Sequence, residues 1–179
     1  MLKFMLSLGS AQAVYEYYIR VSMRIEIIKQ AGLKRVEVDD VNRFLQNCVD
    51  KGYLLHGSNL FCEILEPRLG YCLTGLKENL QVAVYATISP LIAIFNAIRH
   101  NRRGYARYEL IHGNTYLEVD RTLIESLGEG YVYVLDRSRF QQCRIEEGQF
   151  TSQEGIRPIC VTKVTKRDLN YPIRLVNGH

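Results

Sequence analysis

The sequence lacks tryptophan, has only 4 prolines and contains no long apolar run. No stretch approaches the roughly 20 apolar residues of a membrane-spanning helix, which excludes such a span. The N-terminal residues 1–8 resemble the apolar part of a signal peptide, but this stretch is short and is broken by Lys3. We therefore expect a cytoplasmic protein that makes no membrane contact.

The sequence also lacks paired cysteines. Five cysteines are scattered along the chain, and no two have the spacing of a zinc knuckle or a redox motif, which favours reduced thiols. His100 and His112 have no neighbouring ligand-type residues, so the sequence predicts no metal site. The cysteines are Cys48, Cys62, Cys72, Cys143 and Cys160.

Neither sign of charge strongly exceeds the other. The net charge is +4 and the isoelectric point is about 8.8, which suits an anionic ligand but does not by itself indicate a nucleic-acid protein. The densest basic run, at 99–103, closes a predicted helix, where positive charge complements the helix dipole. Contact between this run and nucleic acid is the alternative interpretation.

Several common catalytic signatures are missing. The sequence has no phosphate-binding loop, no Gly-x-Gly-x-x-Gly fingerprint, no Gly-x-Ser-x-Gly elbow and no His-Glu-x-x-His pair. These absences argue against the enzyme classes that those motifs mark.

The 179 residues are enough for one domain with a proper core. Apolar residues at helical spacing predict a helix over 11–31, with Ser10 as its cap and Gly32 after its end. A second helix is predicted to begin near residues 38–40 and to end at Gly52. We therefore predict that residues 1–51 form a helical segment packed on a core domain of residues 52–179.

The core domain is predicted to be rich in strands. Strand patterns occur at 53–56, 82–87, 107–111, 115–119, 131–135, 140–145 and 159–164. Ser89 and Pro90 predict the start of a helix, 122–127 a helical turn and 69–79 a surface loop. Strands that follow strands, with the helices gathered toward the N-terminal half, predict the α+β class.

Polar residues stand at the ends of three of these strands. His56, followed by Gly57 and Ser58, ends the first strand, Tyr85 lies late in the second, and Glu154 precedes the last. An aromatic ring can stack on nicotinamide, and glycine backbone can bond its amide. A histidine suits the ribose hydroxyls, and a carboxylate can stabilise oxocarbenium character when the glycosidic bond breaks. Taken alone, His56-Gly57-Ser58 is equally typical of a strand that runs into a turn.

His56-Gly57-Ser58, the Tyr85 strand before a helix of small residues, and a late glutamate together resemble the ADP-ribosyltransferase superfamily. The resemblance is to its His-Tyr-Glu class, which includes diphtheria-type toxins and poly(ADP-ribose) polymerases, and it spans about residues 53–165. It implies a split antiparallel β-sheet core and NAD as co-substrate. By residue, it implies that His56 bonds the ribose, Gly57 and Ser58 hold the carboxamide, Tyr85 stacks on nicotinamide and Glu154 is catalytic.

Other positions leave alternatives open within this resemblance. Glu146 and Glu147 compete with Glu154 for the catalytic role, although their position before Gly148 suggests a solvated turn. Phe95 is the nearest counterpart of the family's second stacking aromatic, or else a core residue. Arg68 suits the NAD pyrophosphate, or else is an exposed arginine. The additional arginines and histidines of the tRNA 2′-phosphotransferases, which share the fold, have no match here.

The resemblance implies a bacterial or phage-related toxin or defence enzyme that transfers ADP-ribose to a macromolecule. The acceptor, protein or nucleic acid, is left open, and an antitoxin or another partner protein is compatible with such a role. The alternatives are an NAD glycohydrolase and a catalytically inactive module that binds an NAD-like ligand or a partner.

Overall fold

The structure is a computed structural model. It describes residues 26–30, 32–69, 81–100, 105–111, 114–143 and 148–176, and for 26–30, 109–111 and 114–115 it describes the backbone alone. Within these residues no helix is both long and apolar enough to cross a membrane.

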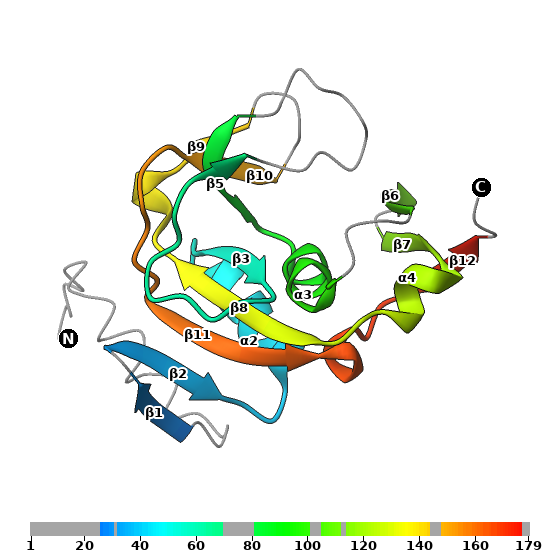
Figure 1. Ribbon diagram of the computed structural model, residues 1–179, viewed down its shortest axis with the longest axis horizontal. Coiled ribbons are helices and arrows are strands. Elements are labelled where there is room, and N and C mark those ends of the chain that lie inside the picture. The colour runs from blue at the N-terminus through cyan, green and yellow to red at the C-terminus, as the bar shows by residue number, and fades with distance from the viewer. Residues whose placement is uncertain are drawn as a thin grey trace, which may run out of the picture.

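A large mixed sheet organises the described chain (Figure 1). Its strand order is β1-β2-β11-β8-β3-β5-β10-β9, and β4 pairs with β5 outside this path. The bounds are β1 Glu26–Gln30, β2 Leu33–Glu37, β3 Leu54–Ser58, β4 Arg68–Leu69, β5 Val82–Thr87, β8 Glu129–Leu135, β9 Gln141–Gln142, β10 Gln149–Ser152 and β11 Cys160–Thr165. The α+β class is therefore confirmed.

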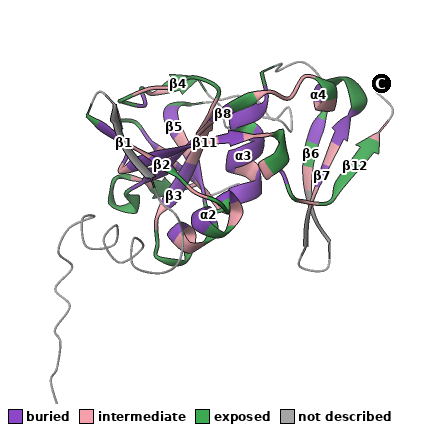
Figure 2. Cartoon of the chain, turned by 90° about the horizontal axis from the view of Figure 1, so that it is seen from below, coloured by how far each residue is buried: buried purple, intermediate pink, exposed green. Residues whose placement is uncertain are grey.

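A second, three-stranded sheet stands at one end of the molecule, beside α4 (Figures 1 and 2). Its order is β12-β7-β6, with β12 parallel to β7. Its elements are β6 Ala106–Ile111, β7 Asn114–Asp120, α4 Arg121–Glu125 and β12 Ile173–Val176. The strand β12 lies in the tail for which the sequence predicted no element.

Two capped helices pack on the same face of the large sheet. Asp40 caps α2, Val41–Asp50, by accepting the Arg43 N–H at 3.0 Å, as the acidic start at 38–40 predicted. Ser89 caps α3, Pro90–Ile98, which confirms the Ser-Pro start signal. Short 3₁₀ turns, η2 Arg137–Arg139 and η3 Lys166–Asp168, follow β8 and β11.

The predicted helix over 11–31 is wrong for residues 26–30, which form β1, while residues 1–25 lie outside the described part. Gly32 does not follow a helix but, at φ +82°, occupies the turn into β2. The strands β1 and β2 extend the large sheet through β11, so the description of residues 1–51 as helical is also wrong for 26–30 and 33–37.

Residues alternate between two core clusters on the two faces of the sheet (Figure 2). Leu55, Val132 and Val134 belong to the cluster beneath α2 and α3. Leu54, Tyr133 and Leu135, one position along on the same strands, belong to the cluster on the opposite face. Both faces of β3 and β8 are therefore buried over most of their length, and this fixes the register in which β3 presents its last residues.

Most of the remaining strand predictions are confirmed, and two predicted segments lie partly outside the described residues. The runs at 82–87, 107–111, 115–119, 131–135 and 159–164 correspond to β5, β6, β7, β8 and β11 and are confirmed, as is the helical turn, which is α4. The run at 140–145 contains the short β9, with 144–147 outside the described residues. The predicted loop at 69–79 also lies outside them, except for Leu69, which ends β4.

Candidate functional site

The strands β3 and β5 separate where the sequence predicted a site. A single register pair, Leu55 with Thr87, joins them within the described residues, whereas β3 stays paired with β8 as far as Ser58. His56, Gly57 and Ser58 therefore follow the point of separation, along an edge that faces β5 without a continuing strand ladder. This interruption leaves residues 56–58 of β3 without ladder partners on the β5 side within the described residues.

The imidazole of His56 bridges this separation. Its Nδ1 lies 2.6 Å from the carbonyl oxygen of Tyr85. A carbonyl oxygen can only accept a hydrogen bond, so Nδ1 carries the hydrogen and Nε2 of the neutral ring is an acceptor. Burial lowers the pKa of His56 below 6.5 and the positive charge of Arg68 lowers it further, although the bond to Tyr85 acts in the opposite direction. At neutral pH the ring is thus a neutral group of fixed tautomer, suited to a hydroxyl donor.

Tyr85 contributes its backbone, not its ring, to the contact with His56. The alternation along β5 turns the Tyr85 side chain away from the face that carries Val84 and Ala86, whereas His56 shares the face of Leu54. The Tyr85 hydroxyl donates to the Gln81 carbonyl at 2.9 Å and accepts the Gln81 N–H at 3.2 Å. The His56 and Tyr85 side chains therefore lie on neighbouring strands but project from opposite faces of the sheet.

The Gln81 side chain extends the tyrosine network, because its Nε2 donates to Thr151 Oγ1 at 3.0 Å. Thr151 pairs with Tyr85 across β10 and β5. The motif search missed Gln81 and Thr151, and no spacing rule would have found them.

Gly57 is required by the packing of α3. A Cβ built on Gly57 would lie 1.9 Å from the Ala93 carbonyl oxygen and 2.7 Å from the Ala97 nitrogen. Gly130, in the neighbouring strand β8, meets the Ala97 carbonyl oxygen in the same way, at 2.0 Å. The two glycines form a notch that seats the helix backbone directly on the sheet, which accounts for Gly57 without a ligand.

Ser58 and Tyr133 hold the loop that follows β3. The Ser58 Oγ accepts the Leu60 N–H at 3.1 Å. The buried Tyr133 hydroxyl donates to the Leu60 carbonyl and accepts the Cys62 N–H, both at 2.8 Å. The Tyr133 ring lies 6.2 Å from the His56 ring. Desolvation by burial raises the pKa of Tyr133 to about 12, so this hydroxyl keeps its hydrogen and acts as a structural clamp.

Arg68 lies in electrostatic range of His56. It pairs with Ala83 through β4 and β5, and its side chain is exposed. The structure therefore places Arg68 on β4, beside β5, the strand that carries Tyr85.

Glu154 lies on the other side of β5 from His56. It follows the end of β10 and forms an ion pair with Arg139, in which Nη2 and Oε2 are 2.5 Å apart. β5 lies between β10 and β3, and Arg139 precedes β9, the outer neighbour of β10. Both side chains are largely exposed, Glu154 at 70%. Its contact is therefore with the outer part of the sheet, which the linear motif order did not indicate.

The other candidate positions are settled only in part. Phe95 is a fully buried core residue, with its ring edge-on to Tyr108 at 5.9 Å, which confirms the core alternative and not the stacking aromatic. Glu146, Glu147 and His112 lie outside the described residues. No group of three or more potential metal ligands occurs within the described ranges.

The buried cysteines among the described residues are expected to be unreactive. Cys48, Cys62, Cys143 and Cys160 are free thiols. Desolvation by burial raises the pKa of Cys48 to about 12 and raises that of Cys160 as well. Neither of these two buried thiols is suited to act as a nucleophile at neutral pH.

The chain was compared with known proteins in three ways. Neither a scan against protein-family models nor searches of curated proteins and of solved structures gave a significant match.

Proposed function

We propose that this protein is an NAD-dependent ADP-ribosyltransferase that cleaves the nicotinamide–ribose bond and transfers ADP-ribose to a macromolecule. The observation that carries the proposal is the His56 imidazole, held as a neutral tautomer at the point where β3 and β5 separate. A histidine in this state accepts a hydrogen from a ribose hydroxyl through Nε2. Arg68, within electrostatic range, supports the binding of an anionic dinucleotide there.

The proposed reaction assigns one task to each group. The bond between ribose C1′ and the nicotinamide nitrogen breaks, and its electron pair stays with nicotinamide, which leaves neutral. A nucleophilic oxygen or nitrogen of the acceptor forms the new bond to C1′ and releases a proton. Glu154 stabilises the developing positive charge on the ribose and receives that proton. His56 orients the ribose, and the Tyr85 carbonyl holds the His56 ring in position.

Glu154 must leave Arg139 to take this role. The ion pair joins two exposed side chains, and such pairs contribute only about 0–1 kcal/mol. Its release therefore costs little compared with the binding energy of a dinucleotide.

The deciding assay measures nicotinamide release from NAD, with two variants of His56. His56→Asn keeps a nitrogen donor near the position of Nδ1, so the bond to Tyr85 is retained while Nε2 is removed. His56→Ala removes both. We expect release to fall about fivefold to tenfold in His56→Asn, since one hydrogen bond of about 1–1.5 kcal/mol is lost in the transition state.

The acceptor is tested with labelled NAD and a cell extract. Label that enters a macromolecule supports transfer, and nicotinamide release that needs no extract identifies an NAD glycohydrolase instead. A wild-type protein that releases no nicotinamide under either condition contradicts both activities.

A second candidate function is the binding of an NAD-like ligand without turnover. Two observations favour it: Glu154 is paired on the outer side of β5, and the Tyr85 ring projects from the face opposite to His56. In that case NAD binds with a measurable heat, Glu154→Gln binds equally well, and neither protein releases nicotinamide. A large loss of nicotinamide release in Glu154→Gln, with NAD binding retained, contradicts this second candidate.

A further inference from the structure

A depression of about 440 Å³ lies where β8 begins and β11 ends. It is lined by Gly128, Glu129, Thr165, Lys166 and Arg167. Glu129 and Thr165 are register partners, so the first residue of β8 and the last residue of β11 form its floor. The 3₁₀ turn η3 forms its wall and supplies the two basic side chains.

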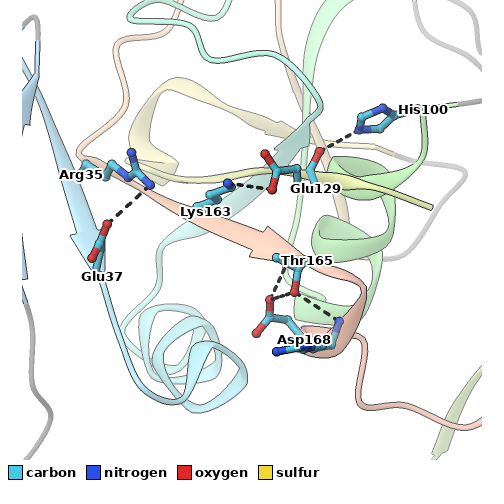
Figure 3. Close-up of polar contacts among 8 residues, drawn as sticks. Arg35, Glu37, His100, Glu129, Lys163, Thr165 and Asp168 are labelled. Atoms are coloured by element: carbon cyan, nitrogen blue, oxygen red, sulfur yellow. Dashed lines mark hydrogen bonds and ion pairs between the residues drawn. The ribbon is translucent and has the colours of Figure 1, made fainter.

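The charges around the depression are predominantly positive. The Glu129 carboxylate is already paired with Lys163 Nζ at 2.7 Å (Figure 3). The Asp168 carboxylate is turned onto Thr165, where Oδ2 accepts the backbone N–H at 2.7 Å and the hydroxyl at 3.0 Å (Figure 3). Lys166 and Arg167 are exposed, and no ion pair to either occurs within the described ranges.

Lys163 therefore neutralises Glu129 and Asp168 is bonded to Thr165, so Lys166 and Arg167 are the two cations that the lining leaves for a ligand. Lys166 Nζ donates to the Ile124 carbonyl at 3.2 Å, which uses one of its three hydrogens and positions the ammonium group. His100 borders the same place, with its ring against Gly128 and its Nε2 on the Glu129 carbonyl (Figure 3). Such a surface attracts an anion that several cations can share, as a phosphate does.

The face of β8 that carries Glu129 leads from the depression toward His56. Tyr131 follows Glu129 on the same face of β8 and pairs with Lys163 on one side and Ser58 on the other. The next residue on this face is Tyr133, the register partner of His56. Four residues separate the Glu129 and Tyr133 rows, which is roughly 13 Å of strand. The half-buried Tyr131 ring, edge-on to Phe61 at 5.4 Å, lies between them.

We propose that the depression binds phosphate groups of a single-stranded nucleic acid and that Tyr131 receives one of its bases. Basic groups that alternate with an aromatic ring are the usual means of holding a single strand. The inference rests on the proposed function in one respect: it identifies the acceptor of ADP-ribose as nucleic acid.

The strand order favours a nucleic acid over the dinucleotide at this place. β3 lies between β5 and β8, so Arg68 and the depression flank His56 from opposite sides. Arg68 serves the pyrophosphate of NAD on the β5 side. The cations on the β8 and β11 side are then left for the phosphates of the second reactant.

The test measures binding of a fluorescent 12-nucleotide single strand, as RNA and as DNA, by anisotropy at several salt concentrations. The double variant Lys166→Glu/Arg167→Glu is compared with wild type. The control, Arg43→Glu/Lys51→Glu, makes the same charge change at exposed positions on and just after α2. Thermal melting verifies that each variant is folded, and Arg167→Ala alone leaves the Lys166 bond to Ile124 intact.

We expect wild-type binding to weaken with salt with a logarithmic slope of about −1.4, because Lys166 and Arg167 each meet a phosphate. The double variant should bind at least tenfold more weakly, with a slope near zero, while the control changes less than twofold. Equal losses in both double variants, or no loss in either, overturn the proposal. A double variant that loses affinity for NAD but not for the oligonucleotide also overturns it, because the depression then serves the dinucleotide. Specific oligonucleotide binding by a protein that releases no nicotinamide supports this surface and contradicts the enzymatic proposal alone.

Discussion

Substitution of Gly57 by alanine should destabilise the protein strongly. The new Cβ would lie 1.9 Å from the Ala93 carbonyl oxygen and 2.7 Å from the Ala97 nitrogen, and both are backbone atoms of α3. To reach ordinary contact the helix must recede by more than about 1 Å. Backbone cannot move aside as the end of a side chain can, so the whole helix has to shift.

The shift would disturb the best-packed part of the core. Leu91, Ile94 and Phe95 of α3 are each fully buried. Overpacking of a well-packed core costs about 1–3 kcal/mol, and a clash with backbone belongs at the upper end. About 3 kcal/mol corresponds to a decrease in Tm of about 6–12 °C for a chain of this size.

Circular dichroism during thermal and urea unfolding measures this change, with Gly155→Ala as the matched control. A Cβ at Gly155 would meet the end of the Glu66 side chain at 3.3 Å, so its effect should stay within about 0.5 kcal/mol. If Gly57→Ala melts within about 2 °C of wild type, the two-glycine notch is not what holds α3. Gly57 would then need a different explanation, with ligand binding the first to test.

Three further predictions concern stability. Tyr133→Phe should lower the free energy of unfolding by about 1–3 kcal/mol, because the Leu60 carbonyl and the Cys62 N–H lose their partner. Cys62 should also be alkylated faster than in the control Tyr131→Phe. Unchanged alkylation would contradict the clamp. Asp120→Asn should lower the free energy of unfolding in urea by a similar amount, because its carboxylate accepts hydrogen bonds from the N–H groups of Leu123 and Tyr105 and from the Thr122 hydroxyl. The same change at the exposed cap Asp136 should cost less. Equal costs would argue against this network. Because the pKa of His56 is lower in the folded protein than its ordinary 6.5, the unfolded chain binds the proton first and the urea midpoint should fall as the pH drops below 6.5. His56→Asn should remove that part of the pH dependence, and an identical decline in both proteins would show that other groups cause it.

Local signals predicted the elements best where one residue decides the structure. Asp40 and Ser89 cap α2 and α3 because a side-chain oxygen at that position satisfies a free backbone N–H, which is a local effect. The stretch 26–30 shows the limit of such signals. Its apolar spacing also fits a helix, yet it pairs with β2 in the structure, because tertiary pairing overrides a local pattern.

The candidate site shows the same limit at longer range. The strand that contains His56 was predictable from its apolar run, but it continues to Ser58 and does not end at the histidine. The placement of Glu154 was not, because the order of motifs along a chain does not reveal that β5 lies between β10 and β3. Gly57 illustrates a further gap, since a glycine required by a helix backbone and one required by a ligand look identical in sequence.

The notch formed by Gly57 and Gly130 also bears on which side of the separation between β3 and β5 can move. β3, β8 and α3 are locked together by backbone contact, so they form one rigid wall. On the other side, β5 is attached to β3 by the Leu55–Thr87 pair and by the His56 bond to the Tyr85 carbonyl. Any widening must therefore come from β5, pivoting near Thr87. The His56 imidazole, which would bind a ribose, also restrains that movement through its bond to the Tyr85 carbonyl.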